Sequence, residues 1–346
     1  MPSQYQSAFL AFFVCACFLP AVIWLARKLN LYDSPGPLKI HEGRIPRLGG
    51  IAMAAGLLAS AGLFFPLNSW QAFMALFALL GVWAVGLADD VLNLPSIFRF
   101  FVQIAAGGAL WFAGWRVDWF RIHLLDFAAT CLFVALVINA MNLLDGMDGL
   151  AAGMGIVISL GFVVISTGSS DIMGIITAWS LLGVCFGVLT ANAPPAKIFM
   201  GDSGSTLIGV VLAFLSLDWV RIEPASHSMV VPIIFLGIPI ADVGLAILRR
   251  IRSRAALFTG DRNHYYDILL RRGWTVRHVL EVSFGISCLL VLTGWLCARG
   301  MLSAGIAAGI SATGLASAAY FLGSLQLAFK LAQNSHEGTP LGSALD

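Results

Sequence analysis

Residues 131–165 read CLFVALVINAMNLLDGMDGLAAGMGIVISLGFVVI, two apolar runs separated by a short polar segment that contains Asp145 and Asp148. With their flanking residues, both runs are long enough for transmembrane helices, because about 20 apolar residues cross a bilayer core of roughly 30 Å. A carboxylate at membrane depth is costly, so it usually lines a cavity or pairs with a cation. The stretch therefore predicts two membrane helices that meet at a polar, functional junction.

The rest of the chain repeats this apolar pattern. Of its 346 residues, 59% are hydrophobic and 11% are charged, whereas about half of the residues in a soluble domain are apolar. We expect an all-α, polytopic membrane protein with 10–11 transmembrane helices in one domain over residues 1–330, followed by a disordered tail over residues 331–346. Eleven candidate helices are predicted at residues 7–27, 49–66, 70–88, 97–115, 123–142, 150–168, 172–190, 204–220, 229–248, 279–298 and 303–326. Pro232 and Pro239 fall inside the ninth candidate, which should be broken or bent.

The basic residues are distributed unevenly between the predicted loops. Sixteen of the 20 Lys and Arg side chains fall on one side of the membrane, and four fall on the other: Arg116, Arg121, Arg221 and Arg299. Cytoplasmic loops are enriched in Lys and Arg, so the N-terminus is expected outside and the C-terminus in the cytoplasm. The net charge of +2 gives no reason to expect a nucleic-acid partner.

Acidic residues gather in three loops on the predicted cytoplasmic side. These loops contain Asp89 with Asp90, Asp145 with Asp148, and Asp202. Carboxylate oxygens are the ligands that Mg²⁺ prefers, and the ion usually takes one or two of them together with substrate phosphates. We therefore predict a Mg²⁺ site with Asp202, Asp90 and Asp89 as candidate ligands.

Neighbouring residues suggest what else this side could bind. Gly201 and Gly204 flank Asp202, which would let an anion approach the backbone at a helix start. The basic segment 35–50 could bind phosphate, although ordinary cytoplasmic charge also explains it. The single acids on the other side are interpreted as helix caps: Asp118, Asp126, Asp171 and Asp218.

Four segments, in order along the chain, resemble the polyprenyl-phosphate N-acetylhexosamine-1-phosphate transferases, a family that includes the enzymes starting lipid-linked peptidoglycan and O-antigen synthesis. The segments are PLKIHEGRIPRLGG (37–50), DDVLN (89–93), NAMNLLDGMDGLAAG (139–153) and NAPPAKIFMGDSGSTLIG (192–209). The likeness extends over about residues 30–280, and the two longer central segments are highly specific.

The resemblance implies an activity and a location. It implies transfer of a sugar 1-phosphate from a UDP-N-acetylhexosamine to undecaprenyl phosphate, with release of UMP and a requirement for Mg²⁺, or Mn²⁺ in its place. The protein would lie in the bacterial inner membrane among membrane lipids, with its active site on the cytoplasmic face, and a homodimer is allowed.

The resemblance also implies roles for individual residues. The implied catalytic residues are Asp89, Asp90, Asp145, Asp148 and His264, while Asp202 holds the metal with help from Asp89 and Asp90. The implied substrate-binding residues are Lys39, His41, Arg47, Asn142, Asn192, Phe199, Tyr266 and Asp267, with the Phe199 ring stacking on uracil.

The sequence departs from the family pattern just after His264. Where much of the family has further histidines, this chain has Tyr266 and Asp267. These side chains offer a bulkier apolar face and a hydrogen-bond acceptor. They could favour a 6-deoxy donor sugar, N-acetylfucosamine or N-acetylquinovosamine, over N-acetylglucosamine, so the donor sugar stays open.

Two mechanisms fit the predicted site. In a single displacement, the lipid phosphate attacks the sugar-bearing phosphorus, and the anomeric configuration is retained. In a double displacement, Asp89 or Asp90 attacks first and forms an aspartyl-phosphate. The single displacement is favoured because a monoester phosphate is mostly dianionic at neutral pH and barely needs a base.

A multi-span transporter with a cytoplasmic acidic site is the alternative function. The proline-broken helix and Asp242 within it would suit a transporter. However, transporter sites lie near the midplane between internal repeats, whereas these motifs cluster on one face and the sequence has no detectable repeat. Asp242 is therefore interpreted as a helix-packing residue or an acid at the rim of the site.

Overall fold

The computed structural model describes residues 4–33, 44–167, 171–223, 228–254 and 263–319. Two strands of two residues, β1 (Tyr32–Asp33) and β2 (Ile45–Pro46), pair antiparallel. The helices are α1 (Gln4–Lys28), α2 (Gly49–Phe64), α3 (Trp70–Leu92), α4 (Ser96–Phe112), α5 (His123–Leu144), α6 (Leu150–Ile165), α7 (Ile172–Asn192), α8 (Gly201–Ile222), α9 (Val230–Phe235), α10 (Gly237–Ser253), α11 (Tyr265–Arg271), α12 (Val276–Ala298) and the apolar helix Ala304–Ala319.

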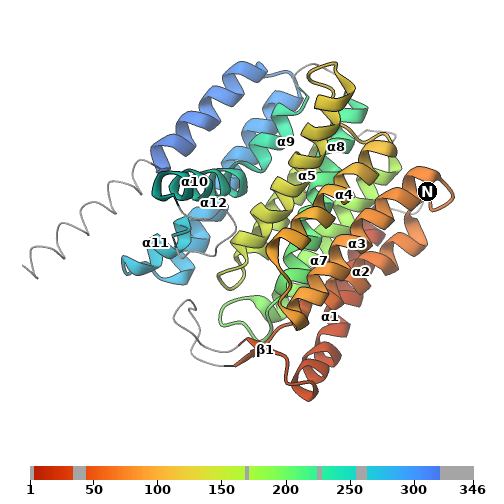
Figure 1. The fold of residues 1–346 in the computed structure, drawn as a ribbon, viewed down its shortest axis with the longest axis vertical. Helices are drawn as coiled ribbons and strands as arrows, with labels where there is room; N and C mark the ends of the chain where they lie inside the picture. The colour runs from red at the N-terminus through yellow and green to blue at the C-terminus, as the bar shows by residue number, and fades with distance from the viewer. Residues whose placement is uncertain (1–3, 34–43, 168–170, 224–227, 255–262, 320–346) are drawn as a thin grey trace, which may run out of the picture.

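Six of these helices are long and apolar enough to cross a membrane: α1, α3, α5, α7, α8 and α12. Four shorter apolar helices accompany them, namely α2, α4, α6 and Ala304–Ala319. Figure 1 shows helices α1 to α8 gathered into one bundle, with α10, α11 and α12 along one side. Large apolar side chains such as Phe9, Phe73 and Phe101 are exposed on the outside, as the hydrocarbon of a bilayer requires. The predicted all-helical, polytopic membrane protein is confirmed, while the predicted orientation of its termini stays a prediction.

The predicted break in the ninth candidate helix is confirmed. Residues 229–248 do not form one helix, because α9 ends at Phe235 and α10 begins at Gly237. Pro232 and Pro239 lie on either side of this junction, and each lacks the N–H that would continue the helical hydrogen bonds.

Three segments differ from the helix limits expected from hydropathy. The prediction of one long loop around His264 is wrong in part, because helix α11 begins at Tyr265. Helix α3 continues to Leu92, so Asp89 and Asp90 lie in its last turn and not in a loop. Helix α8 begins at Gly201, so Asp202 belongs to its first turn. The predicted tail, residues 331–346, lies outside the described residues.

Helix α8 is the central element of the bundle. It is the most enclosed of the six long helices, with every residue from Ser203 to Trp219 buried, and it packs against α2, α3, α5 and α7. Two glycines make this close packing possible. A Cβ at Gly209 would lie 2.5 Å from Ile138 Cα on α5, and one at Gly86 on α3 would lie 2.8 Å from Ser203 Cα. The start of α8 is therefore held tightly against α3 and α5.

Candidate active site

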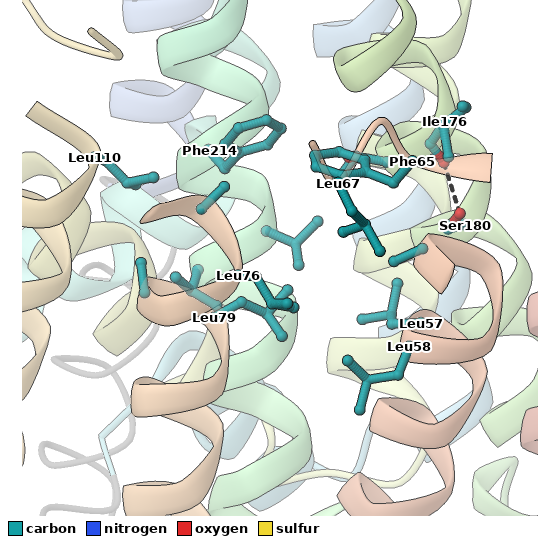
Figure 2. A pocket seen from close by; sticks show the side chains of 16 residues that line it. Leu57, Leu58, Phe65, Leu67, Leu76, Leu79, Leu110, Ile176, Ser180 and Phe214 are labelled. Carbon is teal, nitrogen blue, oxygen red and sulfur yellow. Dashed lines mark hydrogen bonds between the residues drawn. The ribbon is translucent and has the colours of Figure 1, made fainter. Parts of the chain in front are cut away.

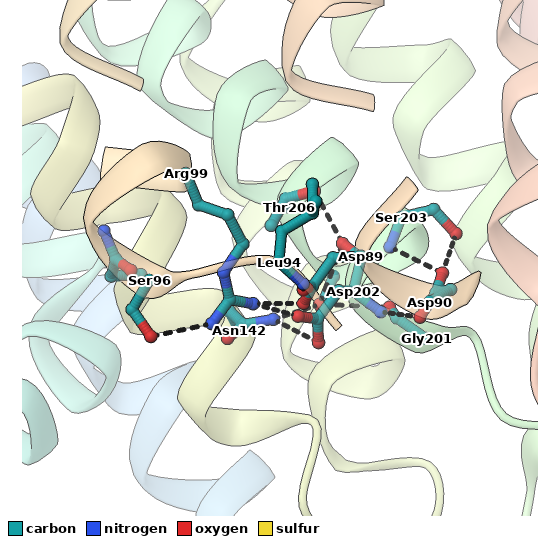
Figure 3. A network of polar contacts seen from close by, with 12 residues as sticks. Asp89, Asp90, Leu94, Ser96, Arg99, Asn142, Gly201, Asp202, Ser203 and Thr206 are labelled. Carbon is teal, nitrogen blue, oxygen red and sulfur yellow. Dashed lines mark hydrogen bonds and ion pairs between the residues drawn. The ribbon is translucent and has the colours of Figure 1, made fainter. Parts of the chain in front are cut away.

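Four helix ends meet at one place in the bundle. Asp89 and Asp90 lie in the last turn of α3, Arg99 in the first turn of α4, Asn142 in the last turn of α5 and Asp202 in the first turn of α8. Figure 3 shows their polar groups gathered into one network. The fold thus joins two of the predicted acidic segments and adds a cation that the sequence interpretation did not include.

Arg99 connects two of the predicted functional carboxylates. Its Nη1 donates to Asp89 Oδ2 at 2.5 Å and also to Asp202 Oδ2, while Nη2 donates to Ser96 Oγ at 3.3 Å. The Arg99 and Asp202 side chains are 24% and 31% exposed, so a ligand can reach them from solvent. Two carboxylates around one guanidinium leave a net negative charge, which favours a further cation.

Asp90 faces a different partner from its neighbour Asp89, because successive residues of a helix point about 100° apart. Asp90 Oδ1 accepts from the Asp202 N–H at 2.8 Å, and Oδ2 accepts from Ser203 N–H at 3.1 Å and from Ser203 Oγ at 2.6 Å. Asp90 therefore caps the start of α8 from another helix. A Cβ at Gly201, where φ is +71°, would lie 2.5 Å from Asp90 Oδ1. The expected room for a substrate anion at this helix start is thus taken by Asp90.

Asn142 holds Asp202 from the opposite side. Its Nδ2 donates to Asp202 Oδ1 and to Ser205 Oγ, both at 3.0 Å. Each Asp202 oxygen therefore has a donor, Arg99 on Oδ2 and Asn142 on Oδ1. This arrangement fixes the direction of the carboxylate before any ligand arrives.

Asp89 and Asp202 fit the chemistry of a Mg²⁺ site. Among the described residues, no group of three or more His, Cys, Asp or Glu side chains could form a complete metal cage. Mg²⁺ does not need one, since it takes one or two carboxylates and completes its shell with phosphate oxygens and water. The Oδ2 atoms of Asp89 and Asp202 converge on the same Arg99 nitrogen. Asp90 is less suited than either, because it is only 3% exposed, whereas the Asp89 and Asp202 side chains are 11% and 31% exposed.

The junction between α5 and α6 forms a second part of the site. Asp148 Oδ2 accepts from the Ala196 N–H at 2.9 Å, and Asn192 Oδ1 accepts from the Gly149 N–H at 3.2 Å. Asn192 Nδ2 also donates to Ile198 O at 3.0 Å. Asp148 and Asn192 therefore fasten the junction to the loop that leads into α8.

Asp145 lies at the same junction, directly after the last residue of α5. Burial, followed by repulsion from Asp202 and Asp90, raises the pKa of its carboxyl well above the ordinary value. Asp145 therefore lies close enough to Asp202 and Asp90 for their charges to disfavour its ionised form. A cation in this region would relieve that repulsion.

Part of the basic segment also lies against this loop. Phe199 N–H donates to Pro46 O at 2.8 Å, and Arg47 forms an isolated bridge with Phe199. Arg47 Nε is buried, and no partner is found for it within the described residues. An unsatisfied guanidinium nitrogen is suited to an anion. The two other candidates in this segment, Lys39 and His41, lie outside the described residues.

His264 and Tyr266 approach the α5–α6 junction from the other side. The His264 and Tyr266 rings stack with centroids 5.7 Å apart, and Tyr266 OH donates to Leu143 O at 3.0 Å. Asp267 is also buried, at 5% exposure. The structure therefore places the predicted residues of the last loop next to the segment that carries Asp145.

A separate apolar pocket lies farther along the bundle. Its lining includes Leu57, Phe65, Leu110 and Phe214 (Figure 2). Ser180, a polar residue of the lining, already shares a hydrogen bond of 2.6 Å with Ser60. This lining offers no charged group for a nucleotide or a phosphate, so the polar chemistry belongs to the cluster at the helix ends.

Sequence reasoning missed two residues of the site region, Arg99 and Ser203, because it treats Arg99 only as a cytoplasmic charge. Asp242, interpreted from the sequence as a packing residue or an acid at the rim of the site, lies with its Oδ2 2.6 Å from His264 Nδ1. The available signals were an Arg soon after an Asp pair and a carboxylate inside an apolar helix.

Comparison with known proteins agrees with this geometry. A model of glycosyl transferase family 4 matches residues 72–220, which include Asp89, Arg99, Asn142 and Asp202. The chain is 32% identical over 302 residues to a decaprenyl-phosphate N-acetylglucosaminephosphotransferase of Mycobacterium tuberculosis, covering 75% of this chain and 74% of the relative. The chain belongs to glycosyl transferase family 4.

Two further relatives of this glycosyl transferase family 4 member have related names. A probable undecaprenyl-phosphate N-acetylglucosaminyl 1-phosphate transferase of Bacillus subtilis is 29% identical over 297 residues, with 80% of this chain and 82% of the relative covered. An undecaprenyl-phosphate alpha-N-acetylglucosaminyl 1-phosphate transferase of Escherichia coli is 27% identical over 297 residues, with 78% and 77% covered. The family resemblance seen in the sequence is thereby confirmed.

Proposed function

We propose that this protein transfers N-acetylglucosamine 1-phosphate from UDP-N-acetylglucosamine to undecaprenyl phosphate and releases UMP. The product would be the first lipid-linked intermediate of a cell-envelope polysaccharide. The carboxylate pair of Asp89 and Asp202, held by Arg99 at the helix ends, is the observation that carries this proposal. Membership in a transferase family favours it over the transporter alternative.

The residues of the cluster divide into ligands and supports. Asp202 and Asp89 would hold Mg²⁺, while Asn142 and Asp90 keep Asp202 and the start of α8 in place. When bound, Mg²⁺ would neutralise the charge that the donor diphosphate develops during transfer. Arg99 and Arg47 are the described cations best placed to balance phosphate charge around it.

The acceptor supplies its own nucleophile. Its phosphate is mostly dianionic at neutral pH, so direct attack on the sugar-bearing phosphorus requires chiefly positioning and charge balance. Asp89 already accepts from Arg99 and from the Leu94 N–H, which suits a ligand better than an attacking group. We therefore propose a single displacement that leaves the sugar–oxygen bond intact.

The location follows from the two substrates. The nucleotide sugar is water-soluble, whereas the polyprenyl chain is confined to the bilayer, so a site at the ends of membrane helices serves both. We propose that this end of the bundle faces the cytoplasm of a bacterial inner membrane, with residues 1–330 acting as one domain.

The donor sugar can be assigned by direct assay. Purified protein in nanodiscs would receive undecaprenyl phosphate, Mg²⁺ and one UDP-sugar carrying ³²P on the phosphate next to the sugar. Label in the lipid product together with free UMP is expected with UDP-N-acetylglucosamine. UDP instead of UMP, or unlabelled lipid, would contradict phosphosugar transfer.

The same assay tests the alternative that Tyr266 and Asp267 favour a 6-deoxy donor sugar. Turnover only with UDP-linked N-acetylfucosamine or N-acetylquinovosamine would replace the proposed donor with a 6-deoxy sugar. Omission of Mg²⁺, with EDTA added, should remove activity, and addition of Mn²⁺ should restore it in part.

A further inference from the structure

A buried pair of ionisable side chains lies apart from the Asp89–Asp202 cluster. His264 Nδ1 and Asp242 Oδ2 are 2.6 Å apart, and the two side chains are 4% and 3% exposed. A carboxylate removed from water to this extent is costly unless its hydrogen bonds are satisfied. A residue needed only for packing could be apolar, so a buried carboxylate at Asp242 requires an explanation.

The pair fixes the histidine ring chemically. A carboxylate can only accept hydrogen bonds, so His264 Nδ1 carries the proton and donates to Asp242. The ring then acts on a substrate through Nε2. Asp242 Oδ1 accepts from the Tyr265 N–H at 3.1 Å, so the same side chain also fixes the backbone next to His264.

The ring is also fixed relative to the active site. Tyr266 stacks on His264 with an angle of 11° between the two ring planes, and the Tyr266 hydroxyl donates to Leu143 O at 3.0 Å. A Cβ at Gly146 would lie 2.1 Å from that hydroxyl oxygen, so the glycine makes room for the contact. Asp242 therefore determines the ring's tautomer, and Tyr266 determines its place beside the α5–α6 junction.

We propose that Asp242 is a positioning residue, which holds His264 in its Nδ1-protonated form so that Nε2 acts on the diphosphate of the sugar donor. The proposal rests on the proposed function, since it needs an anionic donor at His264. Asp242 lies on α10 and His264 directly before α11, so both partners belong to the part of the chain beyond the helix break.

A double-mutant cycle on the full-length protein tests this proposal. Asp242→Asn should lower kcat for UMP release about 10- to 100-fold, as loss of an orienting partner does for metal-bound histidines, with the donor KM changed less than about threefold. Asp242→Glu should recover part of the activity because it restores the carboxylate. His264→Gln should lose at least as much as Asp242→Asn, and the double variant should lose little more than His264→Gln.

Ser283→Ala is the matched control on the same part of the fold. It removes the 3.0 Å contact with Tyr265 OH without touching Asp242 or His264, and kcat should stay within about twofold. Additive losses in the double variant, or an unchanged kcat in Asp242→Asn, would overturn the proposal.

The four proteins of the cycle, namely the wild type, Asp242→Asn, His264→Gln and the double variant, separate this proposal from the proposed function. Their thermal unfolding midpoints report the coupling between Asp242 and His264 without any turnover. A coupling near zero in these midpoints would contradict an interaction between Asp242 and His264. If the wild-type protein releases no UMP from any donor, the proposed function fails and the catalytic role of the pair fails with it, even where the coupling is present.

Discussion

Helix α8 carries a carboxylate–arginine cluster at each end, and the two clusters differ in how far the carboxylate on the helix is exposed. Each has two carboxylates bridged by one arginine: Asp89, Asp202 and Arg99 at the start of the helix, and Asp171, Asp218 and Arg221 at its end. Their charges are the same. Their surroundings are not, and we expect this difference to separate a reactive site from a structural one.

At the end of α8, the carboxylate on the helix is enclosed, while its partner Arg221 is 38% exposed. Asp218 is 4% exposed, and its Oδ1 accepts from Trp115 Nε1 at 2.8 Å and from Arg221 at 2.7 Å. Asp171 caps α7 through the Gly174 N–H, as interpreted from the sequence, whereas the interpretation of Asp218 as a cap was wrong. At the start of α8, by contrast, Asp202 is 31% exposed. A carboxylate pair can take a further ligand only where it is accessible.

The largest expected effect on turnover comes from a substitution at Asp202. Asp202→Asn should lower UMP release roughly 100- to 1,000-fold, because it removes one charge from the position where transition-state charge is balanced. The amide keeps the shape of the side chain, but its NH₂ replaces an oxygen that accepts from Arg99 or Asn142, so a small fall in the unfolding midpoint is expected. Asp218→Asn is the matched control at the other end of the helix. Equal turnover in Asp202→Asn and Asp218→Asn would contradict a functional difference between the two clusters.

Arg99 should rank next in its effect on turnover. Arg99→Gln removes the charge that joins Asp89 and Asp202 and should lower kcat about 100-fold, whereas Arg99→Lys keeps a point charge and should lose about tenfold. Initial rates at saturating substrates measure both. If the lysine variant were no better than the glutamine variant, the positive charge would not be what matters at this position.

Arg221 should affect stability more than turnover. Arg221→Met leaves Asp218 buried without its cation, which should lower the free energy of unfolding by about 1–3 kcal/mol. The unfolding midpoint in detergent is the measurement, and kcat below that midpoint should stay close to wild type. A loss of turnover without a loss of stability would mean that the two ends of α8 are not functionally distinct.

The smallest expected effect depends on pH. Burial raises the pKa of Asp171, but hydrogen bonding with Asp218, the Gly174 N–H and Arg221 together lowers it below the ordinary value. The stability from Asp171 is therefore present above about pH 4, the ordinary value for an aspartate, and is lost as the pH falls through the lower folded pKa. Asp171→Asn should cost at most about 1 kcal/mol at pH 7, and its difference from wild type should shrink toward pH 3. A difference that stayed constant with pH would contradict this assignment.

The helices were predictable from the sequence for a physical reason. Inside a bilayer every backbone polar group must be satisfied within its own segment, so a long apolar run has to be a helix. The polar junction at Asp145 and Asp148 was predictable too, because acids interrupting such a run are costly. Both arguments use only local composition.

Partners distant along the chain were not predictable in this way. An arginine beside the membrane has the same composition signal whether it faces lipid headgroups or, like Arg99, a carboxylate 103 residues away. Asp89 and Asp90 are identical neighbours, yet one binds Arg99 and the other caps α8. Their roles depend on which helix packs on each side, which hydropathy does not record.

The length of α8 sets how firmly its first turn must be held. Asp202 and Asp218 are sixteen residues apart, or about 24 Å along the helix axis. If a rigid rod of this length pivoted about the Arg221 end, a tilt of roughly 2–3° would displace Asp202 by about 1 Å. The close contacts at Gly86 and Gly209 resist such a tilt, so the alignment of the reacting groups does not depend on the distant cluster.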